Sequence, residues 1–265
     1  MPELLEVEAY RRLAERLALH RPIAAVQASD AWYLKRGLTA GDLEVLVGGW
    51  FVAARRRGKL LLLDTELPRG RTGPVLGLRF GMTGRLVVDG AAGVDELRYS
   101  SNRLLAKYER FGVTFADGGR LAVFDPRRLG GVEVNPDEGR LGYDAATVTE
   151  AQLAHALDRS RSALKARITD QGHLAGLGNL SADEVLWRAG LSPFRPAGSL
   201  SPAEITRLHR QLRAALADMA KRGGSHTGDL MPARAAGGKC PRDDHVLRHD
   251  RLGGRSTWWC PAHQH

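Results

Sequence analysis

The first residues that could do chemistry are Pro2 and Glu3, in Met1-Pro2-Glu3-Leu4-Leu5. Removal of Met1 would leave Pro2 with a free secondary amine beside a carboxylate. An α-amino group has a pKa of roughly 7.7 to 8.0, so much of it is unprotonated and nucleophilic near neutral pH. A secondary amine that condenses with C1′ of a sugar gives a cationic iminium, which accepts electrons when a nearby bond breaks. Pro2 is therefore a candidate nucleophile, although a proline at position 2 commonly signals only methionine removal.

Two further segments place polar groups where a rigid element begins. Lys59 opens an otherwise apolar strand, Leu60 to Leu63, and is expected to point off its edge. The turn Gly176-Leu177-Gly178-Asn179 leads into a helix and follows a helix that contains Lys165. Backbone N–H groups at a helix start, with the Asn179 side chain as an extra donor, form a seat for a phosphate. Taken alone, the Lys59 pattern also fits an ordinary charged residue at a strand end, and the Asn179 turn also fits a capped helix that binds no ligand.

The last segment of the chain carries a spacing typical of a zinc site. Cys240 begins one half and Cys260-Pro261-Ala262-His263 forms the other, which supplies three credible ligands. For the fourth ligand we expect His245, the better zinc ligand chemically, with Asp243 as the alternative. Because neither half contains Cys-x-x-Cys, a hairpin without metal is the competing interpretation.

The composition favours a folded protein that binds a polyanion. Lys and Arg outnumber Asp and Glu by 39 to 30 over 265 residues, and the isoelectric point is about 10.0. No apolar run is long enough for a membrane span, and no signal-like segment opens the chain. Two cysteines are too few for a disulfide framework. We expect an intracellular protein.

The periodicity of apolar residues divides the chain into a mixed and a helical part. A helical stripe covers residues 3–19, short apolar runs typical of strands follow from Ile23 to Val134, and helical patterns return afterwards. The predicted fold class is α+β, with an N-terminal helix and a two-layer β-sandwich, followed by a helix–two-turn–helix and a β-hairpin. The predicted parts are residues 1–138, a linker at 139–149, a helical domain at 150–238 and the hairpin at 239–265. The expected strand runs are 50–52, 60–63, 75–78, 86–88, 113–115 and 121–124, and the expected helices are 153–157, 164–169, 182–188 and 203–220.

Six cues occur in one order along the chain: Met-Pro-Glu-Leu, Gly-Lys-Leu-Leu-Leu-Leu, Gly-Met-Thr-Gly-Arg-Leu, Asp-Pro-Arg-Arg, the Asn179 turn and Gly-Arg-Ser-Thr. In this order the chain resembles the formamidopyrimidine-DNA glycosylase/endonuclease VIII family of base-excision repair enzymes. The mixed Cys/His hairpin is similar to that of an actinobacterial, endonuclease VIII-like member. The resemblance implies a bifunctional DNA glycosylase and AP lyase with a structural Zn²⁺.

The resemblance also implies roles for individual residues. Pro2 would attack C1′ of the damaged nucleotide and Glu3 would assist opening of the sugar ring, after which β- and δ-elimination cut the strand. Lys59, Asn179 and Arg255 match phosphate-binding positions, and Lys59 would also aid the proton transfers.

A second group of matched residues would handle the DNA once the damaged nucleotide leaves the stack. Met82 matches the residue that fills the vacancy, and Arg127 matches the arginine that faces the orphaned base. Leu129 stands where the guanine-type branch has Phe, and Lys165 would add a contact to the DNA backbone.

Departures from the family pattern bear on the substrate. Leu5 replaces a proline of the usual opening, and the loop before the hairpin lacks a long segment that caps oxidised guanine. This favours oxidised pyrimidines, with oxidised purines as the alternative. Other hypotheses are a catalytically inactive DNA-binding homologue and an RNA- or ribosome-associated protein. The expected partner is damaged double-stranded DNA, with single-stranded or bubble DNA as further candidates. We expect a monomer, without a membrane partner, in the cytoplasm with the nucleoid.

Overall fold

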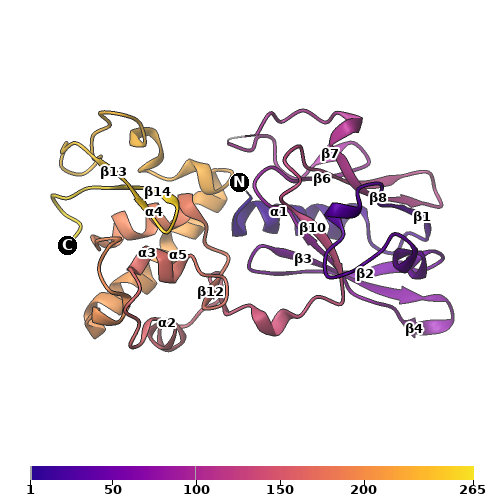
Figure 1. Ribbon diagram of the computed structural model, residues 1–265, viewed down its shortest axis with the longest axis horizontal. Helices are drawn as coiled ribbons and strands as arrows, with labels where there is room; N and C mark the ends of the chain where they lie inside the picture. The colour runs from indigo at the N-terminus through magenta and orange to yellow at the C-terminus, as the bar shows by residue number, and fades with distance from the viewer. Residues whose placement is uncertain (1, 99) are drawn as a thin grey trace. The chain divides into compact units, whose positions relative to one another are not determined.

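The computed structural model describes residues 2–98 and 100–265 (Figure 1). By their contacts these residues form two compact units, which we describe separately. The sandwich unit contains Pro2 and residues 6–138, and the helical unit contains residues 3–5 and 139–265. The helix α1 (Leu4–Leu17) therefore contributes its first two residues to the helical unit and the remainder to the sandwich unit.

The sandwich unit is built from two antiparallel sheets. One sheet has the order β1 (Ile23–Gln27), β8 (Glu109–Phe115), β9 (Arg120–Phe124), β6 (Arg85–Val88), β7 (Ala91–Ala92). The other has the order β10 (Gly131–Val134), β5 (Leu76–Arg79), β3 (Leu60–Leu67), β2 (Trp50–Arg57), and β4 (Arg71–Thr72) also pairs with β3. Short 3-10 turns connect them: η1 (Ala31–Tyr33), η2 (Gly41–Leu46), η3 (Pro68–Gly70) and η4 (Ala106–Tyr108).

The apolar runs of the sequence form the core of this unit. Leu60 to Leu63 are all fully buried, and Leu61 and Leu63 lie in one cluster with Phe111 and Phe115 of the other sheet. Successive strand residues face opposite sides, so a run of four apolar residues fits a strand that is covered on both faces. The cluster also includes Tyr10 of α1. The predicted helix and two-layer sandwich are confirmed.

The helical unit contains four α-helices and two small sheets. The helices are α2 (Glu150–Leu157), α3 (Leu164–Ile168), α4 (Asn179–Ala189) and α5 (Pro202–Arg222), and β13 (Arg248–Leu252) pairs antiparallel with β14 (Arg255–Trp259). The segment predicted as a linker contains η5 (Glu138–Arg140) and β11 (Tyr143–Asp144), which pairs parallel with β12 (Leu174–Ala175). The remaining turns are η6 (Ala197–Ser199), η7 (Ser225–Thr227) and η8 (Met231–Ala233).

Local sequence explains where these helices begin and end. Thr149 and Ser201 form capping boxes with the residues three positions later, and Gly190 and Gly223 end α4 and α5 with positive φ. The predicted helix–two-turn–helix and C-terminal hairpin are confirmed. Among residues 2–98 and 100–265, no helix combines the length and apolarity that crossing a membrane requires.

Candidate active site and metal centre

The Glu3 carboxylate is held at the start of α4, within the helical unit. Its Oε1 accepts a hydrogen bond from the Leu180 N–H at 2.8 Å, and its Oε2 accepts from the N–H groups of Gly178 and Ser181 at 3.0 and 3.1 Å. The Ser181 hydroxyl also donates to Oε2. Glu3 is only 1% exposed. Several N–H donors and the positive end of the helix dipole therefore fix and stabilise this buried negative charge.

Two glycines make room for the chain terminus. A Cβ atom at Gly178 would lie 2.2 Å from Cδ of Glu3, and one at Gly176 would lie 2.5 Å from Cδ1 of Leu4. Gly176 has φ of +119°, and its carbonyl accepts a hydrogen bond from the Leu4 N–H at 3.1 Å. The Gly-x-Gly turn is therefore a clamp for residues 3 and 4, because any side chain there would displace them.

This clamp corrects one prediction. The backbone N–H groups of Gly178, Leu180 and Ser181 were expected to receive a phosphate, but they already donate to Glu3. The carboxylate is the anion that the helix start binds. Asn179 begins α4, and its side-chain oxygen is buried without a hydrogen-bond partner among the described residues.

Pro2 and Lys59 both belong to the sandwich unit. Pro2 is buried and lies two residues before the start of α1. Met1, whose removal would free the amine, lies outside the described residues. Lys59 is the second residue of a two-residue turn between β2 and β3, and Gly58 before it has φ of +58°. The paired strands fix the position from which the half-buried Lys59 side chain extends.

The structure brings the loops of Met82 and Arg127 together. Both loops cross from one sheet to the other, Met82 between β5 and β6 and Arg127 between β9 and β10. Asp125 joins them: its carboxylate accepts from the Thr83 hydroxyl at 2.5 Å and from the N–H groups of Arg127 at 3.2 Å and Gly130 at 2.8 Å. Asp125 is completely buried, so these bonds form away from water.

The side chains on these loops are accessible. Leu129 is 51% exposed, Arg127 is exposed and Met82 is half buried. Within residues 2–98 and 100–265, the Arg127 guanidinium has no hydrogen-bond partner. One edge of the sandwich unit therefore presents an apolar and a cationic side chain to solvent.

Lys165 has a different environment from the one predicted. It is 1% exposed, and its ammonium lies 2.6 Å from Oδ1 of Asp183 and donates to the Ser256 carbonyl at 2.7 Å and the Thr257 hydroxyl at 2.9 Å. Burial lowers the pKa of Lys165, and the Asp183 carboxylate opposes the shift. Arg234 also pairs with Asp183, at 3.0 Å. A DNA backbone contact by Lys165 is not supported, because its charge is already paired in the protein interior.

Arg255, in contrast, is exposed at the first position of β14. Gly253 and Gly254 form the turn before it with φ of +56° and +75°, as a type I′ hairpin requires. One nitrogen of its guanidinium is 3.4 Å from the hydroxyl of Thr169, at the end of α3. The hairpin thus presents Arg255 beside the helix–two-turn–helix, and Lys165 holds the next two residues of the strand.

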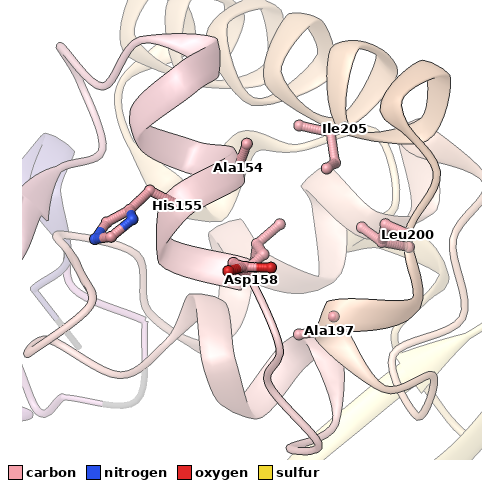
Figure 2. Close-up of a pocket in the computed structure, with 8 residues that line it drawn as sticks. Ala154, His155, Asp158, Ala197, Leu200 and Ile205 are labelled. Carbon is pink, nitrogen blue, oxygen red and sulfur yellow. The ribbon is translucent and has the colours of Figure 1, made fainter.

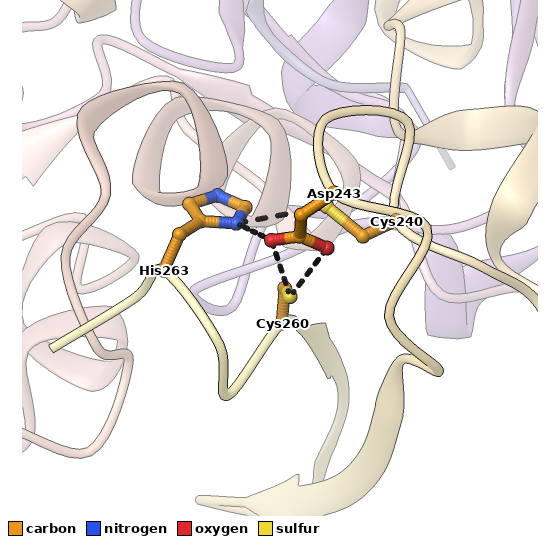
Figure 3. Close-up of side chains that lie close together, drawn as sticks. All are labelled: Cys240, Asp243, Cys260 and His263. Atoms are coloured by element: carbon orange, nitrogen blue, oxygen red, sulfur yellow. Dashed lines mark hydrogen bonds and ion pairs between the residues drawn. The ribbon is translucent and has the colours of Figure 1, made fainter.

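Four side chains form a group that could hold a metal ion: Cys240, Asp243, Cys260 and His263 (Figure 3). Their ligand atoms all lie within 4.8 Å of one another. Nδ1 of His263 is 2.9 Å from Oδ2 of Asp243 and 3.6 Å from Sγ of Cys240, and Sγ of Cys260 is 3.3 Å from Oδ2 of Asp243. Tetrahedral zinc with ordinary bond lengths separates its ligands by roughly 3.3 to 3.8 Å. The donor set therefore suits Zn²⁺, and the separations of Cys240 from His263 and of Cys260 from Asp243 match its spacing.

Neighbouring groups orient these ligands. Nε2 of His263 is 3.2 Å from the Trp187 carbonyl, which leaves Nδ1 for a metal, and the Trp187 indole N–H points at Sγ of Cys240 at 3.3 Å. Burial raises the pKa of the Cys260 thiol to about 11, so a metal would have to displace its proton. His245 is exposed and lies outside the group. The expectation of His245 as fourth ligand is corrected to Asp243, because the turn after Cys240 directs the Asp243 carboxylate inward.

A pocket of about 270 Å³ also opens in the helical unit, between α2, η6 and the start of α5 (Figure 2). Apolar side chains line most of it, together with His155 and Asp158. None of the predicted site residues contributes to its lining. The pocket is therefore separate from the groups described above.

Sequence reasoning missed the residues that hold the site in place. Ser181, Asp125 and Asp183 are buried acceptors or donors that connect segments far apart in the sequence. The only available signal was their position inside motifs already noted, such as Asp125 in Asp-Pro-Arg-Arg.

Two family models match the chain. The formamidopyrimidine-DNA glycosylase N-terminal domain matches residues 1–132, and the helix–two-turn–helix domain of the same glycosylase matches residues 141–230. The first model covers the sandwich unit and the second covers the helices around the Asn179 turn.

Curated proteins called formamidopyrimidine-DNA glycosylase are similar over the full chain. The protein from Alkalilimnicola ehrlichii is 32% identical over 100% of both chains, and that from Chloroflexus aggregans is 31% identical over 100% of this chain and 98% of its own. The Arabidopsis thaliana protein is 33% identical over 80% of this chain, which spans 56% of that protein.

Solved structures show the same similarity. The Lactococcus lactis enzyme in complex with DNA that contains an N7-benzyl formamidopyrimidine lesion superposes with a TM-score of 0.81, at 25% identity over 99% of both chains. Its complex with DNA that contains an oxidised pyrimidine gives a TM-score of 0.82, also at 25% identity over 99% of both chains. The chain belongs to the formamidopyrimidine-DNA glycosylase family of base-excision repair enzymes.

Proposed function

We propose that this chain is a bifunctional DNA glycosylase and AP lyase whose nucleophile is the amine of Pro2 after removal of Met1. The observation that supports this proposal is the anchoring of Glu3. Four hydrogen bonds hold its carboxylate at the start of α4, and the Leu4 N–H is bonded to Gly176. Pro2 is bonded directly to Glu3, so its nitrogen is positioned by the same clamp, which lowers the entropic cost of a defined attack.

The proposed reaction begins when the Pro2 nitrogen attacks C1′ of the damaged nucleotide. The N–C1′ bond forms, the bond from C1′ to the base breaks with its electron pair leaving on the base, and the nitrogen loses its proton. Opening of the sugar ring gives an iminium, and Glu3, whose carboxylate accepts the proton lost by the Pro2 nitrogen, delivers that proton to the ring oxygen. Loss of a proton from C2′ then expels the 3′ phosphate, and a second elimination expels the 5′ phosphate.

Reduction with borohydride tests this mechanism, because it converts the iminium into a stable amine. We expect a covalent adduct between processed protein and a duplex with an abasic site, and peptide mapping should place it on Pro2. Intact mass shows whether Met1 is absent. Material that retains Met1 is the matched control, since its Pro2 nitrogen is an amide. An adduct that maps to a lysine, or none with fully processed protein, would disprove the assignment of Pro2.

We infer that the partner is damaged double-stranded DNA and that the protein acts as a monomer in the cytoplasm, at the nucleoid. Oxidised pyrimidines are the proposed lesions, because the segment between α5 and β13 lacks the long cap expected for oxidised guanine. The name shared by the curated relatives favours oxidised purines as the second candidate. Excision rates on duplexes that each carry one lesion decide between them. Equal or faster excision of oxidised guanine would overturn the preference for pyrimidines.

We also propose that Cys240, Asp243, Cys260 and His263 hold a structural Zn²⁺. The metal would supply cross-links between the turn after Cys240 and the end of β14, and no chemistry on DNA. We expect Asp243→Ala and His263→Ala to lose bound zinc in metal analysis of the purified protein. His245→Ala, on the same turn, is the control and should retain it. Zinc lost in His245→Ala and retained in Asp243→Ala would contradict this ligand set.

A further inference from the structure

Trp32 is the most exposed large apolar side chain of the described residues. It is 68% exposed, in the middle of the short 3-10 turn η1 of the sandwich unit. Asp30 caps this turn, and its Oδ1 accepts a hydrogen bond from the Trp32 N–H at 3.1 Å. Tyr33 next to it is fully buried, which anchors the turn in the core. A rigid backbone therefore holds the indole in solvent.

Asp30 ties this turn to the loop that carries Arg127 and Leu129. Its Oδ1 also accepts from Nη2 of Arg128 at 2.6 Å, and its Oδ2 accepts from Nε of Arg128 at 2.6 Å. One carboxylate oxygen thus joins the Trp32 backbone to the neighbour of Arg127. On the other side of Trp32, the Lys35 N–H donates to the Val132 carbonyl at 3.0 Å. These hydrogen bonds hold the turn and the loop next to each other.

The chemistry of this surface is aromatic and cationic. Nζ of Lys35 lies 5.1 Å from the centre of the Trp32 ring and donates to the Trp32 carbonyl at 2.7 Å. Arg127 and Leu129 are exposed on the adjacent loop. An aromatic ring beside a cation suits the backbone of a DNA strand, because a sugar can pack against the ring and a phosphate can pair with the cation. A protein partner that buries an apolar patch would have to desolvate these charges, so the chemistry favours nucleic acid.

We propose that Trp32 and Lys35 form a platform that binds the undamaged DNA strand, with a nucleotide next to the orphaned base against the Trp32 ring and its phosphate near Lys35. This inference rests on the proposed function, because Arg127 is assigned to the orphaned base by family resemblance. The platform extends the contact with that strand beyond Met82, Arg127 and Leu129.

The test combines a protein substitution with a change in the DNA. Wild type and Trp32→Ala are titrated with a complete duplex that contains a stable abasic analogue. They are also titrated with two duplexes whose undamaged strand is shortened, one ending at the orphaned base on its 5′ side and the other ending there on its 3′ side. We expect Trp32→Ala to bind the complete duplex about fivefold or more weakly. With the shortened duplex that lacks the nucleotides in contact with Trp32, wild type and Trp32→Ala should bind with equal affinity. Trp32→Phe should retain most of the affinity.

Controls separate this inference from the proposed function. Val45→Ala removes another exposed apolar side chain of the sandwich unit, 47% exposed, and should bind like wild type. Lys35→Met should reduce the salt dependence of binding by about one phosphate contact. Equal affinity of wild type and Trp32→Ala for all three duplexes would overturn the platform, whatever the result of borohydride trapping. Absence of a borohydride-trapped adduct in wild type would overturn the Pro2 mechanism. The affinities of wild type and Trp32→Ala for the three duplexes would still show whether Trp32 contacts the undamaged strand.

Discussion

At the scale of single residues, Glu3 combines a structural and a chemical role. Its carboxylate replaces the solvent that would otherwise satisfy the first N–H groups of α4, and it lies beside the proposed nucleophile. In the proposed mechanism, Glu3 must keep accepting hydrogen bonds from the backbone of α4 while it also transfers a proton to the sugar. The hydroxyl of Ser181, which donates to Oε2, gives the carboxylate a further donor that a backbone amide could not supply.

Substitution of Glu3 by Gln should therefore affect stability as well as excision. The amide would turn an N–H₂ group toward the N–H groups of α4 and leave a buried donor unpaired, at a cost of about 1–3 kcal/mol in unfolding free energy. Denaturant unfolding measures this loss, and single-turnover excision measures the chemistry. Glu15→Gln, on the exposed side of α1, is the control, because its ion pair with Arg11 contributes little. Equal stability of Glu3→Gln and Glu15→Gln would show that the observed clamp contributes nothing.

The sequence indicated these residues only in part. Pro2, Glu3 and Arg127 were found from their motifs, but the hydrogen bonds of Glu3 join residues about 175 positions apart and leave no local pattern. The same applies to Asp125 and Thr83, which are 42 positions apart. Lys165 was misassigned because a lysine in a basic protein suggests a phosphate contact, whereas its buried partner, Asp183, is visible only in the fold.

At the scale of elements, α5 begins with a capping box that an arginine strengthens. Glu204 accepts from the Ser201 N–H at 2.8 Å and pairs with Arg195 at 2.5 Å. The Arg195 guanidinium, with the Ser201 N–H, lowers the pKa of Glu204 to about 2. Because the folded pKa is below the ordinary value near 4.5, the unfolded chain binds more protons between these values, and the contribution of Glu204 to stability falls as the pH falls from about 4.5 toward 2.

Glu204→Gln keeps an acceptor for the capping box but loses the charge that pairs with Arg195, so it should reduce the unfolding free energy at pH 7 by about 1 kcal/mol. The difference from wild type should shrink as the pH falls from about 4.5 toward 2, because the unfolded chain then binds a proton that the folded Glu204 takes up only near pH 2. Urea unfolding at a series of pH values gives both numbers. A difference that is constant from pH 7 to pH 3 would mean that Glu204 is not ionised in the cap.

The β13–β14 hairpin depends on a buried ion pair. Lys165 binds two consecutive residues of β14 and pairs with Asp183, which in turn accepts from the Trp258 N–H at 3.2 Å. Lys165→Met should therefore lower the unfolding free energy by about 1–3 kcal/mol, because the Ser256 carbonyl and the Thr257 hydroxyl lose their donor, whereas Asp183 keeps Arg234 as a partner. Arg255→Ala should weaken DNA binding without this loss. Thermal unfolding and DNA titration of both variants separate anchoring from contact.

A normally stable Lys165→Met variant with weakened DNA binding would instead support a direct contact with DNA, as first expected from the sequence. Lys165→Met combined with Asp183→Asn is the matched variant. It also takes the carboxylate partner from the buried Arg234, so it should be less stable than Lys165→Met alone.

Strands with strong apolar runs, including the edge strand β2, could be predicted from the sequence, whereas the edge strands β1 and β10 could not. The six predicted runs correspond to β2, β3, β5, β6, β8 and β9, most of which have neighbours on both sides. The strands β1 and β10 were not singled out. Each lies at the edge of its sheet, where one neighbour suffices, and their sequences contain Gln27 and Glu133. β1 is mostly half-buried or exposed, and β10, although buried, has only four residues and includes Gly131 and Glu133, so neither shows a clear apolar run.

At the scale of the whole molecule, the order of the motifs identified the fold and the family, which the family models and full-length relatives confirm. Agreement among six cues along the chain is far more specific than any single motif. Metal ligation could not be settled in this way, because two candidates stood close together on one turn. Only the backbone path, which brings Asp243 and not His245 to Cys260 and His263, distinguishes them.

The charge of the whole chain leads to a prediction about salt. With a formal net charge of +9, the protein should bind DNA mainly through phosphate contacts. Its affinity should fall steeply as the salt concentration rises, because the counterions that binding releases from DNA then enter a more concentrated solution and gain less entropy. Arg255→Ala should reduce the slope of log K against log salt by about one contact. Arg16→Ala removes the same charge from an exposed position near the end of α1 and should leave the slope unchanged. If both variants reduce the slope equally, binding follows overall charge, and the place of Arg255 beside Thr169 has no special role in holding phosphate.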